Sequence, residues 1–205
     1  MPQTLTLVPV SSTFQGVTMV GGTTPHGVLA DDTDASYVSL PGLGGTHFSL
    51  NFAIGDLPPR ASVLSLTPQF RRALSSGSMM WVTSYLYSTV VRPDGKYPPG
   101  IWNTVTVAAS GGVVSSVDLP AAKDYGGVPW TVDDLNNLNL FFSANQGNIN
   151  SPATLTVRKL TILVTYGVAP LIGAYLPPTG TIYTTTSKPA ILSMFSDPDL
   201  SLIHI

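Results

Sequence analysis

Residues 130–138 read Trp130-Thr131-Val132-Asp133-Asp134-Leu135-Asn136-Asn137-Leu138. Thr131 can cap a short helix by accepting a hydrogen bond from the amide of Asp134, and aspartates in the first turn suit the positive end of the helix dipole. Trp130 can pack onto Leu135 and fix the entry of the chain into the turn. We therefore predict one short helical turn near residues 131–136, set between segments of strand-like alternation.

Alternation with a period of two dominates the rest of the chain. In the clearest segment, one set of alternate side chains is apolar and the other is polar or small; the first set is Phe48, Leu50, Phe52 and Ile54, and the second is His47, Ser49, Asn51 and Ala53. Such alternation is typical of a strand with one buried and one exposed face.

Two following segments carry features that predict their place in a sheet. Leu64, Leu66 and Phe70 share one face of a strand that ends near Leu74. Pro68 lies between them and has no amide hydrogen, which predicts an edge position or a bulge. Residues 79–91 are apolar on both faces, which predicts a central strand covered on each side.

The second half of the chain continues in the same way. Residues 101–107 and 113–119 alternate, and the Gly-rich segment 108–112 between them predicts a hairpin. In residues 153–166 the apolar side chains change parity at Arg158-Lys159. Because a change of parity needs one extra residue in the strand, we predict a β-bulge there.

A further strand over residues 138–144 brings the expected number to about nine, separated by turns rich in Gly, Pro and Asn. This organisation predicts an all-β fold, an antiparallel β-sandwich of two sheets packed face to face. A jelly roll is the first choice. An immunoglobulin-like sandwich is the second, because such domains are usually about 100 residues long.

Composition limits the classes of function. The 205 residues carry a net charge of −2 and no cysteine, and charged residues make up 10% of the chain, against about 25% in an average soluble domain. The basic doublets Arg71-Arg72 and Arg158-Lys159 place neighbouring side chains on opposite faces of a strand, so neither forms a local patch. We therefore expect no nucleic-acid binding. We also expect no signal peptide and no membrane insertion, because the start is not basic and apolar runs are short.

Three segments are similar to β-sandwich structural proteins of tailed bacteriophages: residues 27–38 (Gly-Val-Leu-Ala-Asp-Asp-Thr-Asp-Ala-Ser-Tyr-Val), the helical turn, and residues 157–164 (Val-Arg-Lys-Leu-Thr-Ile-Leu-Val). The resemblance implies a non-enzymatic virion component of the tail, fibre or head-decoration type. Such a protein assembles in the host cytoplasm, contacts other virion proteins, is expected to form a homo-oligomer, and can attach to the host surface.

The character of the chain changes after Gly167. Residues 1–167 are expected to form the sandwich, and residues 168–180, rich in Pro and Gly, a stiff linker that begins an extended C-terminal tail. Residues 181–205 resemble the opening strands of a fibronectin- or immunoglobulin-like module. About 25 residues cannot bury an independent core, so we expect a truncated second module. The final residues, 200–205, resemble translated sequencing-adapter read-through and are expected to be artefactual.

Aromatic side chains form the first candidate ligand site. Trp81, Tyr85 and Tyr87 lie on the same parity of one strand, and Tyr97 and Trp102 flank the loop that follows it. An exposed row of rings can stack against sugars, which makes a carbohydrate-binding module the alternative function. In a sandwich such a row is more often core or a contact with another subunit.

A second candidate site is the acidic cluster Asp31, Asp32 and Asp34, whose oxygens allow a calcium site in a tight loop. The competing interpretation is that these side chains only cap the turn through hydrogen bonds to the backbone, and we favour it. No other cofactor is expected.

Catalytic residues are not predicted. The chain has no Gly-x-Ser-x-Gly elbow, no phosphate-binding glycine loop and no metal-ligand spacing of histidines. A glycan depolymerase, which would use a pair of aspartates, is a distant third hypothesis.

Overall fold

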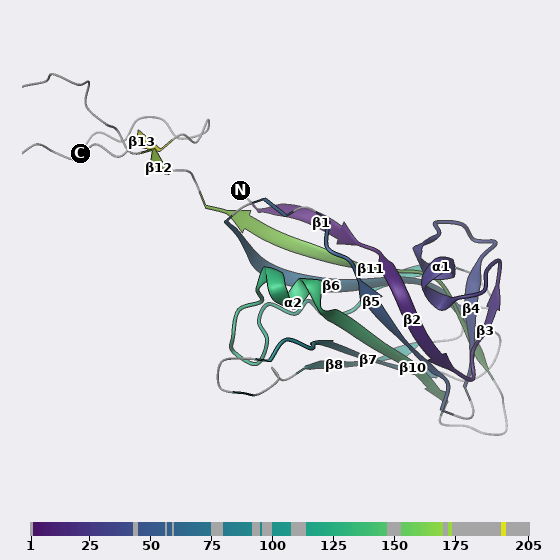
Figure 1. Cartoon of the computed structure of the whole chain (residues 1–205). Helices are drawn as coiled ribbons and strands as arrows, with labels where there is room; N and C mark the ends of the chain where they lie inside the picture. Colours follow the sequence, from purple (N-terminus) through teal and green to yellow (C-terminus); the bar gives the residue numbers. More distant parts are fainter. Residues whose placement is uncertain are drawn as a thin grey trace, which may run out of the picture.

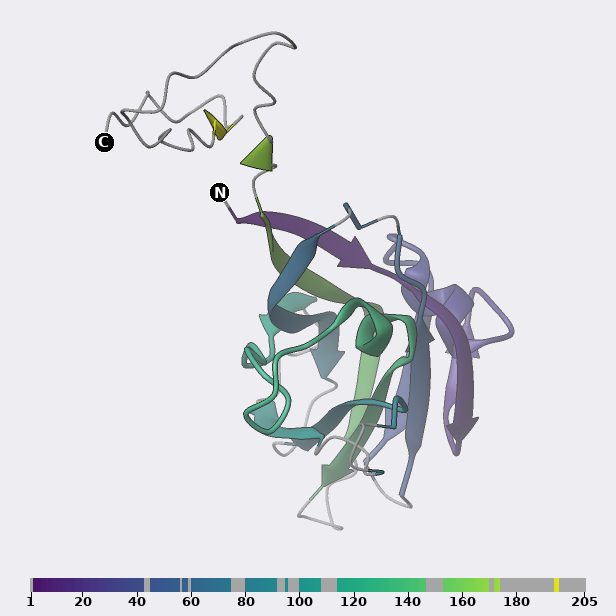
Figure 2. The same cartoon turned by 60° about the vertical axis from the view of Figure 1, so that its left-hand side comes forward.

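The computed structural model describes residues 2–42, 45–55, 57–58, 60–74, 80–91, 95, 100–107, 114–146, 153–169, 172–173 and 194–195. Two antiparallel sheets make up most of this part. The six-stranded sheet contains β1 (Gln3–Leu7), β3 (Thr18–Val20), β4 (Tyr37–Pro41), β6 (Ala61–Leu74), β9 (Ser115–Asp118) and β11 (Thr154–Val168). The five-stranded sheet contains β2 (Pro9–Gln15), β5 (His47–Phe52), β7 (Met80–Ser88), β8 (Ile101–Val107) and β10 (Leu138–Gln146). Figures 1 and 2 show the sheets facing each other.

The strand order is that of a jelly roll. In the six-stranded sheet the order is β3-β4-β11-β6-β9, with β1 also paired to β11, and in the five-stranded sheet it is β2-β5-β10-β7-β8. Strands β4 to β11 therefore divide into two antiparallel groups of four, β4-β11-β6-β9 and β5-β10-β7-β8, as in a double-sheet jelly roll. The predicted fold class, with the jelly roll as first choice, is confirmed.

Aromatic and aliphatic side chains between the sheets form one core. Phe142 of β10 lies near its centre: its ring stacks on Phe48 of β5 at 5.0 Å and meets Phe70 of β6 edge-on at 5.3 Å. All three residues are buried, and aromatic pairs in these geometries add to the energy of burial. The predicted alternation along β5 is confirmed, because Phe48, Leu50 and Phe52 are buried in this core.

The helical turn lies where the sequence predicted it. Helix α2 spans Val132–Asn136 with Thr131 as its N-cap, and the capping box is complete: the Thr131 hydroxyl accepts from the amide of Asp134, and the Asp134 carboxylate accepts from the amide of Thr131 at 2.8 Å. Trp130 is buried and meets the Tyr125 ring edge-on at 4.0 Å. The hydroxyl of Tyr125 in turn accepts from the amide of Ser88, so the segment around α2 is tied to the end of β7.

Helix α1 (Pro25–Ala30) was not predicted. It lies at the other end of the sandwich from α2 (Figure 1) and contacts β2 and β11. Thr24 caps it by accepting from the amide of Gly27 at 3.4 Å, and Pro25 occupies the first turn. The Thr-Pro pair is the start signal that sequence reasoning overlooked.

The bulge predicted at Arg158-Lys159 is confirmed by a shift of the β11–β6 register between Val157 and Lys159. A second shift, between Thr165 and Tyr166, was not predicted. It makes Leu64 of β6 the extra residue, and Leu64 is 44% exposed. The expectation that Leu64 shares the core face with Leu66 and Phe70 is therefore wrong.

Pro68 lies in a strand that is paired on both sides, so the predicted edge position is wrong, and the register shifts fall elsewhere. The regular pairing of β6 with β9 covers Gln69 to Arg72 and so begins at the residue that follows the proline. On that side Pro68 uses only its carbonyl, which accepts from the amide of Leu119 at 2.8 Å. The missing amide hydrogen is tolerated because the ladder does not require it there.

The predicted hairpin between residues 101–107 and 113–119 is also wrong, because β8 and β9 belong to different sheets. Alternation identifies a strand but not its partner, and here β8 pairs with β7 while β9 pairs with β6. The connecting residues, 108–113, lie outside the described part.

Most of residues 168–205 also lie outside the described part. Beyond Ala169 the structure describes only β12 (Ile172–Gly173) and β13 (Met194–Phe195), which form a short antiparallel pair. The predicted linker and truncated module stay predictions. Among the described residues, no helix has the length and apolar character needed to cross a membrane.

Candidate functional site

One surface of the sandwich is built without charge. The outward positions of the five-stranded sheet follow from its register and the burial of alternate residues, and we call them together the outer face. It comprises Ser11, Thr13 and Gln15 of β2; His47, Ser49 and Asn51 of β5; Asn139, Phe141, Ser143 and Asn145 of β10; Trp81, Thr83, Tyr85 and Tyr87 of β7; and Trp102, Thr104 and Thr106 of β8. None of them is Asp, Glu, Lys or Arg.

Three rings of the outer face form a stack. Tyr85 of β7 lies opposite Trp102 of β8 in the register, and their ring centroids are 4.5 Å apart with the planes inclined by 20°. Tyr85 also stacks on Tyr87, with ring centroids 5.0 Å apart and planes inclined by 18°. Tyr85 is therefore the ring that joins Trp102 and Tyr87 into one aromatic group.

The two tryptophans are the most exposed rings of the outer face, Trp102 at 63% and Trp81 at 49%. The expectation that both faces of the segment 79–91 are covered is therefore wrong. Alternate side chains of β7 are buried in the core, and the others lie on the outer face. A sequence pattern cannot distinguish a covered apolar face from an exposed one, because both are apolar.

The structure brings together the predicted Trp102, Tyr85 and Tyr87, and places Trp81 further along the same strand face. Tyr97, also predicted, lies outside the described residues. Gly100 lies against the end of the Tyr85 ring, and a Cβ at Gly100 would overlap that ring. The backbone at Gly100 therefore helps to hold Tyr85 in place.

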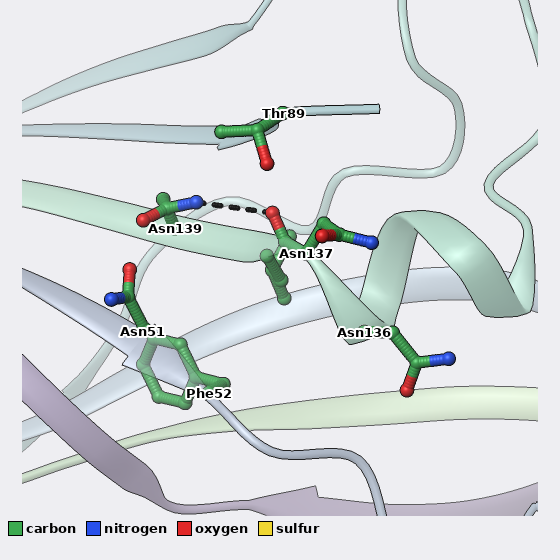
Figure 3. Close-up of a pocket in the computed structure, with 7 residues that line it drawn as sticks. Asn51, Phe52, Thr89, Asn136, Asn137 and Asn139 are labelled. Atoms are coloured by element: carbon green, nitrogen blue, oxygen red, sulfur yellow. Dashed lines mark hydrogen bonds between the residues drawn. The ribbon is translucent and has the colours of Figure 1, made fainter. Parts of the chain in front are cut away.

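A pocket of about 360 Å³ opens at the α2 end of the outer face (Figure 3). Thr89 lies just beyond β7 on the same parity as Tyr87, and Asn139 and Asn51 are cross-strand partners on β10 and β5. Asn136 and Asn137, at the end of α2, complete the polar lining. Sequence reasoning did not find this pocket, because its residues come from two strands, the segment just after a third strand and a helix end, and form no local motif.

Hydrogen bonds fix the walls of the pocket. The carbonyl of Asn137 accepts from the amide of Thr89 at 3.2 Å and from Nδ2 of Asn139 at 3.0 Å, the second bond being drawn in Figure 3. Nδ2 of Asn51 donates to the Ser11 hydroxyl at 2.8 Å. The end of α2 is therefore joined to β7 and β10, and the amide side chains are held in place.

The acidic cluster has partners within the protein. Asp31 accepts from the amide of Thr33 at 3.1 Å and from the hydroxyl of Ser36 at 3.1 Å, which is the turn-capping role expected of such residues. Asp32 pairs with Lys159 at 2.9 Å, while Asp34 pairs with Arg71. Among the described residues, no group of three His, Asp or Glu side chains is arranged to hold a metal ion. Calcium binding by this loop stays an untested prediction.

The two basic doublets, which were not expected to form local patches, contribute to one cluster because Arg71 and Lys159 are cross-strand neighbours. Arg71 and Lys159 both contact Asp32. The hydrogen bond and the charge of Lys159 hold the pKa of Asp32 below its ordinary value of 3.8. Partial burial lowers the pKa of Arg72. This cluster lies on the six-stranded sheet, away from the outer face.

No family model matches the chain, and no curated protein sequence matches it. Among solved structures, the CBM22-1 xylan-binding domain of Paenibacillus barcinonensis Xyn10C aligns with a TM-score of 0.40 and 8% identity, over 78% of this chain and 92% of that one. The xylan-binding module CBM15 aligns with a TM-score of 0.36 and 12% identity, over 78% and 98% of the two chains.

A viral structure, that of the infectious bursal disease virus Gt strain, aligns with a TM-score of 0.31 and 13% identity, over 82% of this chain and 38% of that one. All three TM-scores lie below 0.5. The fold is therefore assigned from the order of the strands in the two sheets, and function is inferred from the outer face.

Proposed function

We propose that the protein binds carbohydrate on the outer face of its five-stranded sheet and is not an enzyme. The observation that carries this proposal is the Trp102 ring, which is 63% exposed and yet stacked on Tyr85 at 4.5 Å. A large apolar ring left in water is typical of a binding surface. The stack also restricts the motion of the ring before a ligand arrives, which lowers the entropic cost of binding.

The surroundings of the stack suit a sugar. A sugar ring has apolar C–H faces and a rim of hydroxyls, so it needs an aromatic face with donors and acceptors nearby. Thr104 and Thr106 continue the outer face beside Trp102 on β8, and Thr83 and Asn145 lie next to Trp81. The outer face therefore offers rings and neutral hydrogen-bonding groups side by side.

Affinity gel electrophoresis against a panel of polysaccharides, with and without calcium, tests the proposal. We expect at least one polysaccharide to retard the protein, and Trp102→Ala to weaken that interaction by about 2 kcal/mol, roughly thirtyfold, as for an aromatic hot-spot residue. The matched control is Phe14→Ala, which removes a ring that is 47% exposed on β2 but does not belong to the outer face. Equal affinity of the Trp102→Ala protein and the wild type would exclude this site.

A second candidate function is the virion component implied by the resemblance to tailed-phage proteins, with host attachment through the same glycan site. The observation that favours it is the exposure of Val10 and Phe14 on the edge strand β2, at 48% and 47%. Exposed apolar residues on an edge strand are suited to contact with another subunit, such as a second copy of this chain.

The solution mass measured by light scattering tests the assembly role. We expect a stable homo-oligomer that dissociates when Phe14→Asp places a charge on the β2 edge. The matched control, Val128→Asp, changes a residue of similar exposure, 43%, outside the named strands. A wild-type protein that is monomeric at every concentration would contradict the homo-oligomer and leave glycan binding unaffected.

A further inference from the structure

The pocket at the α2 end has polar atoms whose hydrogen-bonding capacity is not used by the protein. Asn139 donates through Nδ2 to the carbonyl of Asn137, and a carbonyl can only accept, so this bond fixes the orientation of the Asn139 amide. Oδ1 of Asn139 then remains available. Asn51 donates through Nδ2 to Ser11, which leaves its Oδ1 available as well.

Thr89 adds a third free group, because its backbone amide is bonded to Asn137 while its exposed hydroxyl has no recorded protein partner within the described chain. Figure 3 shows the side chains of Thr89, Asn51 and Asn139 directed toward the same space, and that of Asn136 directed away from it. The pocket therefore presents mainly hydrogen-bond acceptors, which suit a ligand whose hydroxyls donate.

The aromatic stack adjoins residues that line this pocket. Tyr85, Tyr87 and Thr89 follow one another on the same face of one chain segment. Tyr85 stacks on Tyr87, and Thr89 follows Tyr87 on the other side along the chain. Asn139 is the cross-strand partner of Tyr87 on β10, so its amide lies beside the same space.

The charge of the pocket narrows the ligand class. Its lining residues are Asn51, Phe52, Thr89, Asn136, Asn137, Leu138 and Asn139, all of them uncharged, and the adjoining outer face has no Lys or Arg among its described positions. An anionic sugar would lose water around its carboxylate or sulfate without gaining an opposite charge, which disfavours binding.

We propose that this pocket is the specificity subsite of the glycan surface and that it holds one unit of a neutral polysaccharide. The unit packs against the Tyr87 ring, and its hydroxyls donate to Oδ1 of Asn51, Oδ1 of Asn139 and the Thr89 hydroxyl. This inference rests on the proposed function and adds to it the charge class of the ligand and the place where the sugar is selected.

The test uses the full chain with two panels of polysaccharide. The neutral panel is xylan, galactomannan, mixed-linkage β-glucan and amylose, and the anionic panel is polygalacturonate, alginate and chondroitin sulfate. We expect retardation by a neutral polysaccharide only, with little change when salt is raised from 50 to 500 mM, because no ion pair is involved. The variants Asn139→Ala and Thr89→Val should each lower that affinity about fivefold to tenfold, as for loss of one buried hydrogen bond.

The control variant is Gln3→Ala, which removes an exposed amide side chain from β1 of the other sheet and should bind as the wild type does. Thr89→Val keeps the shape of the side chain and the backbone amide, so it stays informative if Asn139→Ala unfolds. Wild-type affinity in either folded variant, or preference for the anionic panel, overturns the subsite. If the subsite is overturned in this way but Trp102→Ala abolishes binding in the same experiment, the proposed function is kept and only the subsite is lost. Binding to neither panel overturns the proposed function and the subsite together.

Discussion

At the scale of single residues, two local interactions have consequences that can be measured separately from binding. The Thr131 hydroxyl accepts from the amide of Asp134 at 3.2 Å and donates to its carboxylate at 2.9 Å, and Asp134 is buried. The carboxylate therefore depends on this cap for part of its solvation.

Thr131→Ala removes both interactions and should destabilise the protein by about 1–2 kcal/mol, the range for loss of an N-cap beside a buried polar group. Thr131→Ser keeps the hydroxyl and should stay within about 0.5 kcal/mol of the wild type. Urea unfolding followed by fluorescence measures both free energies. Equal stabilities for the two variants would show that α2 does not need its cap.

Asp32 gives the protein a defined dependence on pH. Its pKa is lowered in the folded state by the hydrogen bond and charge of Lys159, with a contribution from Arg71. A lowered pKa means that the ionised carboxylate favours the folded state, so this stabilisation is present above the ordinary pKa of 3.8 and is lost as pH falls through the lower folded value.

Asp32→Asn should therefore lower the melting temperature at pH 7, and the difference from the wild type should shrink as the pH falls below 3.8. The effect should be small and should weaken in high salt, because the Asp32 side chain is 65% exposed. Differential scanning calorimetry over a pH series measures it. A difference that grows toward acid pH would have the wrong sign for this ion pair.

At the scale of elements, the bulge in β11 decides which side chains enter the core. Before it, Leu155 and Val157 are buried, and after it Leu160 and Ile162 are buried, so the inward set changes parity. Arg158 is the extra residue: it has no partner in the β6 register, and its guanidinium lies over the Tyr37 ring at 5.2 Å.

Deleting Arg158 should remove the bulge while leaving the inward set in place, because the remaining residues then alternate regularly along the ladder with β6. We expect a folded protein, destabilised by about 1–2 kcal/mol through loss of the contact with Tyr37 and local strain. Deleting Thr161 instead shifts the following residues by one and turns Ile162 and Val164 outward, so that protein should not fold. Circular dichroism and urea unfolding of the two deletion variants distinguish these outcomes. Equal stability of the two variants would contradict the assignment of Arg158 as the extra residue of the bulge.

At the scale of the whole molecule, the sequence predicted what depends on local periodicity and failed where distant segments meet. The capped turn at Thr131, the inward set of β5 and the bulge at Arg158 could be predicted because each is encoded within a few neighbouring residues. The partner of β9 could not, since alternation gives no information on which strand lies alongside.

The same distinction applies to the candidate site. Tyr85, Tyr87 and Trp102 were recognised from parity and position, and the structure places them in one stack. The pocket beside them was missed, because Asn51 and Asn139 are 88 residues apart in the chain and meet only through the β5–β10 register. The sequence also left open whether Trp81 is exposed, because a covered and an uncovered apolar strand face give the same pattern.

The described core residues, from Leu7 to Val164, all precede Ala169, and so do all the described strands of the six-stranded and five-stranded sheets. The free energy of unfolding of a chain ending at Ala169 should therefore lie within about 1 kcal/mol of that of the full chain, because the shorter chain keeps every described residue of the core.

Glycan binding should also be retained in the shortened chain, because the described positions of the outer face and the pocket lie before Ala169. Urea unfolding and affinity gel electrophoresis on the two chains make the comparison. A large loss of stability in the shortened chain would show that residues after Ala169 pack on the sandwich, contrary to the predicted linker. Loss of binding at unchanged stability would place part of the ligand site in those residues.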